Sequence, residues 1–156
     1  MWLYVKAVVN ATVRNGYILL VRRKKSEGDP WSGDIALPGG MIKTGESIVD
    51  AGLRETFEET SILPKSLYVY GVVGVEYPRN APWLRTAILL SKPRGELNIR
   101  PGLEVDDVFW FNPRRSNAYR LLFKDNRLVI GYSVHGGVLW GMTWRVIRKL
   151  IARSII

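Results

Sequence analysis

The sequence predicts an α+β fold in which one mixed β-sheet is flanked by helices. Three observations favour this class: segments rich in β-branched and aromatic residues lie between turn signals, two other segments have helical periodicity, and the two kinds alternate without the regular βαβ rhythm of a doubly wound sheet. With 156 residues the chain has the length of one ordinary domain, so we expect residues 1–156 to form a single domain.

The amino-terminal part is expected to form a hairpin. Residues 3–13 and 17–22 have strand composition, and Asn15-Gly16 between them is a strong signal for a tight hairpin turn. Glycines and a proline mark residues 24–34 as a polar loop that follows the second strand.

The next predicted element is a helix over residues 47–60. A short apolar run over 35–37 precedes it and ends in a glycine-containing turn at 38–40. Ser47 is the expected N-cap of the helix, and Pro64 is expected to stop it.

The carboxyl-terminal half is expected to add strands and a second helix. Strand composition recurs over 67–77, 84–91, 107–111 and 127–134. An amphipathic helix is predicted over 138–154, because one stripe of that segment carries Leu139, Met142, Val146 and Leu150.

The composition limits the kinds of protein that this chain can be. Hydrophobic residues make up 47% of the chain and charged residues 24%, which is enough apolar surface for a core and excludes a disordered tail. There is no cysteine, so disulfide scaffolds, cysteine-ligated zinc and thiol catalysis are excluded. No segment approaches the roughly 18 apolar residues of a membrane span, so we expect a cytoplasmic protein without a membrane partner.

The charges are unevenly distributed along the chain. The formal net charge is +9, but residues 46–59 contain five acidic residues and one basic residue, so this window carries −4 and the rest of the chain +13. At about 100° per residue, Glu55, Glu58 and Glu59 lie on one face of the predicted helix, opposite a more apolar face.

This acidic face has two interpretations. The residues four positions after the glutamates are Glu59, Ile62 and Leu63 rather than Lys or Arg, so the usual stabilising pairs are missing. Two like charges about 6 Å apart repel by roughly 2–3 kcal/mol at an effective dielectric constant of about 20. A hard divalent cation such as Mg²⁺ or Mn²⁺ would relieve that repulsion. A solvated acidic surface is the other interpretation, and the spacing alone leaves both open.

Residues 40–62 resemble the Nudix box, the signature G-x5-E-x7-R-E-U-x-E-E-x-G-U in which U is a bulky apolar residue. Six glycine or charged positions match over 23 residues without an insertion: Gly40, Glu46, Arg54, Glu55, Glu58 and Glu59. Thr56 departs from the aliphatic residue of the signature, on the buried face of the helix. Ser61 replaces its glycine, at a C-cap that favours glycine by up to about 1 kcal/mol. The resemblance implies the Nudix fold, an α/β/α sandwich.

Nudix hydrolases cleave the diphosphate link of a nucleoside diphosphate attached to another group. By this resemblance, Mg²⁺ or Mn²⁺ would be held by the carboxylates of Glu55, Glu58 and Glu59 and by the carbonyl of Gly39. Such ions neutralise substrate charge and lower the pKa of a bound water. Arg54 would orient the glutamates through charge-assisted hydrogen bonds.

The resemblance leaves two candidates for the general base, Glu55 and Glu104. Some Nudix enzymes place a base on a loop in the region of Glu104, before a strand like the one predicted over 107–111. A surface residue beside a strand is the other interpretation of Glu104.

Four residues are candidates for binding substrate. Arg22 and Arg23 adjoin the polar loop and are expected to meet a phosphate. Trp31, in that loop, is expected to stack on a base, and Gly40 permits close approach of the backbone. Ion pairing in solvent is the alternative for the two arginines, and a place against the core is the alternative for Trp31.

The carboxyl-terminal part resembles the coenzyme A pyrophosphatases. Residues 109–113 (FWFNP) and 139–143 (LWGMT) are similar to that branch, whereas Trp31 and Leu37 depart from its upstream signature. Hydrolysis of coenzyme A or its thioesters is therefore the first expectation. ADP-ribose or nucleoside triphosphates, damaged ones included, are the alternative substrates. A basic nucleic-acid-binding module is the remote alternative.

The expected partner is a small nucleotide-type molecule. Nucleic acid is not expected, because RNA-recognition signatures and basic-aromatic repeats are missing from the sequence. A homodimer is compatible with the aromatic amino-terminal hairpin and the apolar last helix. In such a dimer Trp2, Tyr4 or Trp140 would be buried between the subunits.

Overall fold

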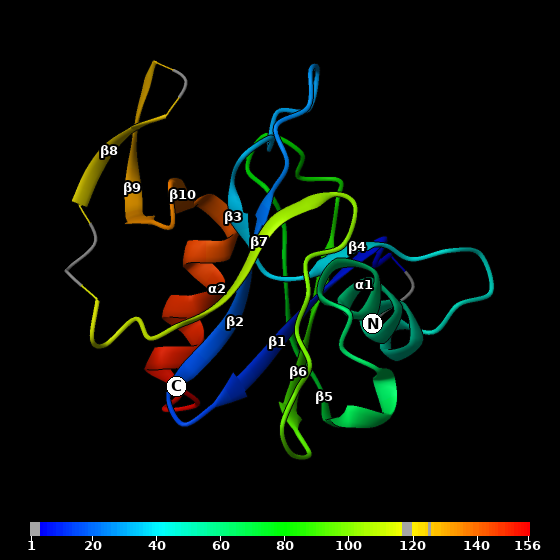
Figure 1. Ribbon diagram of the computed structural model, residues 1–156. Helices are drawn as coiled ribbons and strands as arrows, with labels where there is room; N and C mark the ends of the chain where they lie inside the picture. The colour runs from blue at the N-terminus through cyan, green and yellow to red at the C-terminus, as the bar shows by residue number, and fades with distance from the viewer. Residues whose placement is uncertain (1–3, 117–119, 125) are drawn as a thin grey trace.

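The computed structural model describes residues 4–116, 120–124 and 126–156 and confirms the α+β class (Figure 1). Its strands are β1 (Ala7–Arg14), β2 (Tyr17–Arg23), β3 (Ile35–Ala36), β4 (Gly39–Met41), β5 (Leu67–Glu76), β6 (Thr86–Pro93), β7 (Val105–Phe111), β8 (Arg120–Lys124), β9 (Arg127–Val134) and β10 (Gly137–Trp140). Its helices are α1 (Ile48–Thr60), α2 (Gly141–Ala152) and a short 3₁₀ helix, η1 (Pro64–Ser66). Within the described ranges, no helix is long and apolar enough to cross a membrane.

Strand β1 is the centre of a mixed sheet, as the sequence predicted. It pairs antiparallel with β2 and β4 and parallel with β6. The order along the sheet is β3-β2-β1-β6-β5, and β7 pairs with β2. Strands β8, β9 and β10 form a second, antiparallel sheet. Because β10 runs directly into α2, this second sheet lies at the amino-terminal end of α2 (Figure 1).

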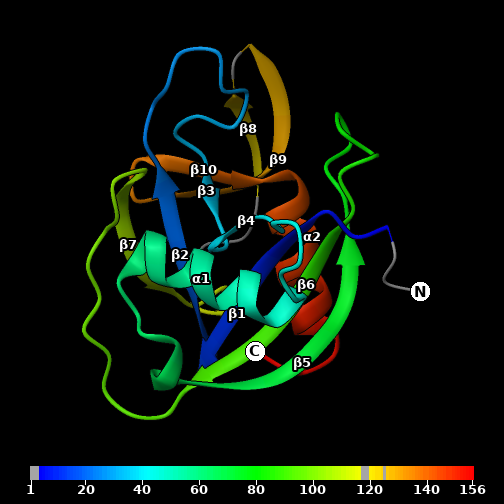
Figure 2. The same ribbon diagram turned by 90° about the vertical axis from the view of Figure 1, so that its right-hand side faces the viewer.

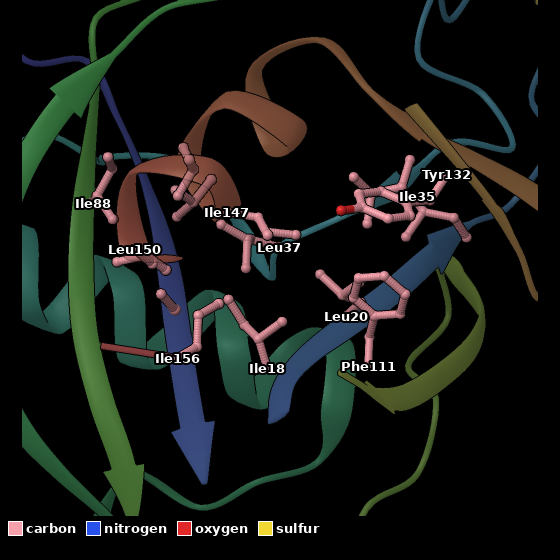
Figure 3. Close-up of a cluster of buried hydrophobic side chains, with 14 of the residues drawn as sticks. Ile18, Leu20, Ile35, Leu37, Ile88, Phe111, Tyr132, Ile147, Leu150 and Ile156 are labelled. Carbon is pink, nitrogen blue, oxygen red and sulfur yellow. The ribbon is translucent and has the colours of Figure 1, made fainter. Parts of the chain in front are cut away.

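The helices α1 and α2 cover opposite faces of the mixed sheet (Figure 2). Successive side chains of a strand point to opposite faces. Val8 of β1 therefore packs in a cluster with Ala51 of α1, whereas Val9 packs in the larger core with Val146 and Ile147 of α2. Figure 3 shows this larger core, where side chains of β2, β3, β6, β7 and β9 meet α2. The predicted sandwich of helix, sheet and helix is thus confirmed.

The local signals of the amino-terminal half are confirmed. Asn15 and Gly16 both have positive φ (52° and 80°), as a type I′ hairpin turn requires. Helix α1 begins after Ser47, whose hydroxyl accepts a hydrogen bond from the amide of Asp50 at 3.0 Å. The helix ends at Ser61, which adopts the left-handed conformation with φ 62°.

Two predicted boundaries are wrong. The helix predicted over 138–154 begins only at Gly141, because residues 137–140 pair with β9 as β10. Leu139 is fully buried in the same core as α2, which explains why it matched the apolar stripe of the helix. The turn predicted at 38–40 is partly a strand, since β4 pairs with β1.

The first strand is shorter than predicted, because β1 begins at Ala7. Of the side chains named for a dimer interface, Trp2 lies outside the described residues. Tyr4 is 73% exposed, whereas Trp140 is partly buried and bonds within the chain. Dimerisation stays a prediction.

Candidate active site

Helix α1 lies beside β4 (Figure 2), and the acidic face of the helix contacts the two glycines of that strand. A Cβ on Gly40 would lie 2.6 Å from the carboxylate of Glu55, so a side chain at this position would displace that carboxylate. A Cβ on Gly39 would lie 2.2 Å from the carbonyl oxygen of Val8, so Gly39 lets β4 pack on β1. The amide of Gly39 donates a hydrogen bond to Oε2 of Glu59 at 3.2 Å. The glycine pair therefore positions two of the three glutamates.

Arg54 holds the acidic side chains together. Its Nε donates to Glu46 Oε1 at 2.7 Å, and its Nη1 donates to Glu55 Oε1 at 2.6 Å and to Glu58 Oε2 at 3.2 Å. Its Nη2 also donates to the carbonyl of Met41 at 3.0 Å, which ties the cluster to β4. The sequence expectation that the glutamates lack basic partners is wrong for Glu55 and Glu58, because their partner precedes them on the helix.

The pKa values of two glutamates differ because their surroundings differ. The hydrogen bond from Arg54, aided by the amide of Lys43, lowers the pKa of Glu46 to about 2. Glu59 is only 7% exposed. Burial, opposed by the hydrogen bond from the amide of Gly39 and aided by the charge of Glu55, raises the pKa of Glu59 to about 8. A buried carboxyl group of this kind is stabilised as an anion when a cation lies beside it.

The chemistry of these side chains fits a hard divalent cation. Carboxylate oxygens are the ligands that Mg²⁺ and Mn²⁺ prefer, and Glu59 is a buried carboxyl group for which a cation would compensate the cost of ionisation. Glu55 and Glu58 are engaged by Arg54. In the described part of the chain, no three acidic or histidine side chains converge in a ready-made ligand cluster. Ligation would therefore need Glu55 and Glu58 to turn from Arg54 Nη1.

A loop before β7 is fastened to the end of α1. The amide of Arg100 donates to the carbonyl of Thr60 at 2.9 Å, and the amide of Gly102 donates to the carbonyl of Glu59 at 3.0 Å. The hydroxyl of Ser61 donates to the carbonyl of Arg100 at 3.1 Å. The last turn of α1 and this loop therefore form one unit.

This loop carries Glu104, the second candidate for the general base. Glu104 is exposed, and its carbonyl accepts a hydrogen bond from the amide of Lys24 at 3.0 Å. The charge of Glu104 also contributes to raising the pKa of Glu59, which places its carboxylate in the electrostatic surroundings of the acidic cluster. The charges of Glu55 and Glu104 both raise the pKa of Glu59.

A cavity of about 430 Å³ opens beside the glycine pair. It is lined by β1, β3 and β4 from the amino-terminal half and by the β8–β9 hairpin and α2 from the carboxyl-terminal half. Gly39 and Gly40 belong to its wall and also contact the acidic cluster. The glycine pair is therefore the part of the cavity wall that adjoins the acidic cluster.

Of the four predicted substrate-binding residues, three line the cavity and one does not. Arg23, Trp31 and Gly40 line the cavity. Arg23 is paired with Asp29 at 2.9 Å, within the loop that carries Trp31. Arg22 is directed elsewhere, because its guanidinium donates to the carbonyl of His135 in the β9–β10 turn.

Sequence reasoning missed a buried polar cluster at the cavity wall. Asp34, which is 5% exposed, accepts a hydrogen bond from the indole of Trp140 at 3.0 Å and pairs with Lys124 at 2.6 Å. All three residues line the cavity. Lys124 and Trp140 lie about 90 and 106 residues from Asp34 along the chain, so no local motif indicated the contact.

Comparisons with known proteins find likenesses that span most of the chain. A family model described as the NUDIX domain matches residues 4–129. An ADP-ribose pyrophosphatase of Methanocaldococcus jannaschii is 36% identical over 128 residues, which are 81% of this chain and 71% of that protein.

Two further likenesses are more distant. The NAD-capped RNA hydrolase NudC of Haemophilus influenzae is 29% identical over 100 residues, which are 64% of this chain but only 36% of that protein. A crystal structure of a bifunctional NMN adenylyltransferase/ADP ribose pyrophosphatase from Francisella tularensis, complexed with AMP and an Mn ion, has a TM-score of 0.58 and 21% identity. That likeness covers 94% of this chain and 41% of the other, and it supports the fold.

Proposed function

The chain belongs to the NUDIX domain family, and we propose that this enzyme uses a divalent cation to hydrolyse the diphosphate of ADP-ribose or of a similar nucleoside diphosphate linked to another group. One observation carries the proposal: the glycine pair of β4 touches the acidic face of α1 on one side and lines a cavity of about 430 Å³ on the other. A substrate in that cavity would present its diphosphate to the carboxylates.

We assign the cation to Glu55, Glu58 and Glu59 together with the backbone of Gly39. When bound, Mg²⁺ or Mn²⁺ supplies charge neutralisation at the diphosphate and acidifies a water. Arg54 holds Glu55 and Glu58, and its contacts with Glu46 and the carbonyl of Met41 would keep it in place if the two glutamates turned toward a cation. Arg54 is thus a positioning residue and does not touch substrate.

The chain's own acid-base chemistry falls to Glu104 or Glu55. One of them accepts the proton of the attacking water, whose oxygen bonds to one phosphorus while the bridging P–O bond breaks. With ADP-ribose, the products of this single hydrolysis are AMP and ribose 5-phosphate. Arg23 and Gly40 face the cavity and would contact the phosphates, and Trp31 would stack on the base.

Several substrates share this chemistry, and the comparisons order them. The relatives reported above are named for ADP-ribose and NAD-capped RNA, so ADP-ribose comes first. Coenzyme A, its thioesters and nucleoside triphosphates remain candidates that the same site would treat alike, because each presents a nucleotide phosphoanhydride. The assay therefore needs a panel of substrates rather than one.

The whole protein is incubated with Mg²⁺, with Mn²⁺ or with a chelator, and with ADP-ribose, NAD⁺, coenzyme A or ATP in turn. Products are identified by chromatography and ³¹P NMR. We expect cation-dependent turnover, fastest with ADP-ribose. Turnover of another member of the panel would reassign the substrate, and no turnover of any member with either cation would contradict the proposed function.

The first prediction concerns the cation ligands. Glu58→Gln combined with Glu59→Gln should abolish turnover, because two negative ligands are lost, while circular dichroism and thermal unfolding stay those of a folded protein. The matched control is Glu96→Gln, an exposed glutamate outside the site. Activity above about one tenth of the unchanged enzyme would exclude these residues as ligands.

The second prediction separates the two candidate bases. If Glu104 accepts the proton, Glu104→Gln should lower kcat by about 10²- to 10⁴-fold without weakening the binding of Mg²⁺. Glu55→Gln should weaken Mg²⁺ binding as well, because Glu55 is assigned to the cation. Calorimetric titration of Mg²⁺ with a non-hydrolysable substrate analogue measures binding beside the kinetics. An unchanged kcat in Glu104→Gln would leave Glu55 as the base.

A further inference from the structure

A basic aromatic surface lies at the end of the mixed sheet that is remote from the acidic cluster. We define it by Tyr68, Tyr70, Lys92, Arg94 and Arg14. The two tyrosines are 44% and 54% exposed. Lys92 and Arg94 are exposed as well.

Two neighbouring strands build this surface through their register. Tyr68 of β5 lies directly opposite Lys92 of β6. The register shifts between Val69 and Gly71, so Tyr70 falls at an irregularity of β5. The two rings form an edge-to-face pair with centroids 5.1 Å apart.

The cations are seated on the rings. Lys92 Nζ lies 5.6 Å from the centroids of both tyrosine rings, and the guanidinium of Arg94 lies 5.5 Å from the ring of Tyr68. Arg94 is held in place because its Nε donates to the carbonyl of Leu67 at 3.1 Å. Positive charge and partly exposed tyrosine rings are thus presented together.

A hollow of about 250 Å³ continues the surface toward the β1–β2 turn. Its wall contains Tyr70, Lys92, Arg14 and the turn residues Asn15 and Gly16. Two basic side chains and an amide therefore surround a space large enough for a phosphate and its sugar.

The position of the surface separates it from the candidate active site. Strand β4 pairs with the first residues of β1, whereas Arg14 is the last residue of β1. At about 3.3 Å per residue, the two places lie roughly 20 Å apart. Figures 1 and 2 show the ends of β1 and β6 beside the start of β5, away from β4.

We propose that the basic aromatic surface binds single-stranded nucleic acid. Exposed tyrosine rings stack on bases of any sequence, and lysine and arginine neutralise the phosphates. A single strand offers free base faces, whereas a duplex hides them in its own stack. The charge is complementary as well, because Lys92, Arg94 and Arg14 give this surface three basic side chains.

The sequence could not indicate this surface. Tyr68 and Tyr70 are separated from Lys92 and Arg94 by more than twenty residues, so no basic-aromatic repeat is visible in the sequence. The expectation that nucleic acid is not a partner rested on that missing repeat. The pairing of β5 with β6 brings the tyrosines and the basic residues together.

The test measures fluorescence anisotropy of a labelled 12-nucleotide RNA strand with the whole protein at several KCl concentrations. We expect micromolar binding at 50 mM KCl that weakens as salt rises. Tyr68→Ala with Tyr70→Ala should weaken binding at least about tenfold and leave the salt dependence unchanged, because stacking is removed but charge is not. Tyr68→Phe with Tyr70→Phe should stay within about twofold, because the rings remain.

The charged pair is tested separately. Lys92→Gln with Arg94→Gln should weaken binding and reduce the slope of log K against log[salt] by about 1.4, which is about 0.7 for each phosphate that is no longer neutralised. The matched control is Tyr4→Ala, an exposed tyrosine outside the surface, and it should bind as the unchanged protein does. Binding is measured without turnover, so the result does not depend on the proposed hydrolysis.

Two further probes distinguish stacking from simple charge attraction. Inorganic polyphosphate has no bases, so the unchanged protein and the tyrosine-to-alanine variant should bind it equally. A duplex of the same sequence should bind more weakly than the single strand. The proposal is overturned if the single strand is not bound at 50 mM KCl, if the duplex is bound as tightly, or if the alanine variant holds the strand as well as the unchanged protein.

Discussion

Thr56 is a buried hydrogen-bonding residue of α1 rather than a substitute for an aliphatic one. Its hydroxyl accepts from Asn10 Nδ2 at 2.9 Å and donates to the carbonyl of Gly52 at 2.7 Å. Asn10 Oδ1 in turn accepts from Ser91 at 2.8 Å, and Ser91 lies 3.0 Å from the hydroxyl of Thr12. This ladder joins α1 to β1 and β6 and fixes how the acidic helix is rotated on the sheet.

Thr56→Val should lower the free energy of unfolding by about 1–3 kcal/mol, because valine keeps the shape and leaves Asn10 Nδ2 buried without its acceptor. Urea unfolding at pH 7 measures the change. The control is Thr44→Val at an exposed position, which should stay within about 0.5 kcal/mol. A neutral Thr56→Val would mean that the ladder contributes nothing to stability.

At the scale of single residues, the sequence predicted burial and backbone conformation better than it predicted which residues contact one another. The burial of Thr56 and the left-handed backbone of Ser61 follow from positions on one helix, so they were predictable. The hydrogen bond from Asn10 to Thr56 joins residues 46 apart, and nothing in either neighbourhood specifies it.

At the scale of elements, the end of α1 and the loop before β7 act as one support for Glu104. Gly102 is pressed against the helix, since a Cβ there would lie 1.8 Å from the carbonyl oxygen of Glu58. Any side chain must push the loop away from α1. This displacement would also move Glu104, which lies two residues further along the chain.

If Glu104 is the base, Gly102→Ala should lower kcat/KM at least about tenfold, because displacing a catalytic group by about 1 Å is costly in rate. The matched control is Gly95→Ala in the same connection, where an added Cβ meets no atom within 4 Å. Steady-state kinetics with the substrate found in the panel measures both variants. Equal activity of the two variants would show that the loop does not position Glu104.

The elements that the sequence predicted are those with local signals. The Asn15-Gly16 turn and the Ser47 cap require only adjacent residues, and both are found. The sequence predicts a helix over most of β10, because four residues that include a buried Leu139 fit either period. Only its pairing with β9 identifies it as a strand.

At the scale of the whole molecule, Glu76 fastens α2 to the sheet. Glu76, at the end of β5, is 8% exposed and accepts hydrogen bonds from Lys149 and Arg145 of α2. Burial raises the pKa of Glu76, but the hydrogen bond from Lys149 and the charges of Lys149 and Arg145 outweigh it, so the pKa lies below its usual value of 4.5. The folded state therefore binds this proton more weakly than the unfolded chain.

Because the folded-state pKa is lowered, Glu76 stabilises the protein above about pH 5 and this contribution is lost as the pH falls through that lowered value. Glu76→Gln should therefore lower the free energy of unfolding by about 1–3 kcal/mol at pH 7, with a smaller difference at pH 3. Urea unfolding across that pH range measures it. A difference that stays constant with pH would exclude the ion pair as its cause.

The cavity is the part of the site that the sequence did not predict. The acidic face of α1 follows from one helix, whereas the cavity wall joins Asp34 to Lys124 and Trp140 across most of the chain. Arg22 and Arg23 are adjacent in sequence, yet only Arg23 lines the cavity, because successive residues of a strand point to opposite sides.

Because both halves of the chain line this cavity, the cavity is complete only when folding is complete. Helix α1 and the glycine pair of β4 belong to the first half of the chain. The cavity is closed by β8, β9 and α2, which leave the ribosome much later. A nascent or truncated polypeptide would thus contain the acidic side chains but lack the complete cavity that could hold a nucleotide. We therefore expect hydrolytic activity only after the amino-terminal and carboxyl-terminal halves of the chain have packed together.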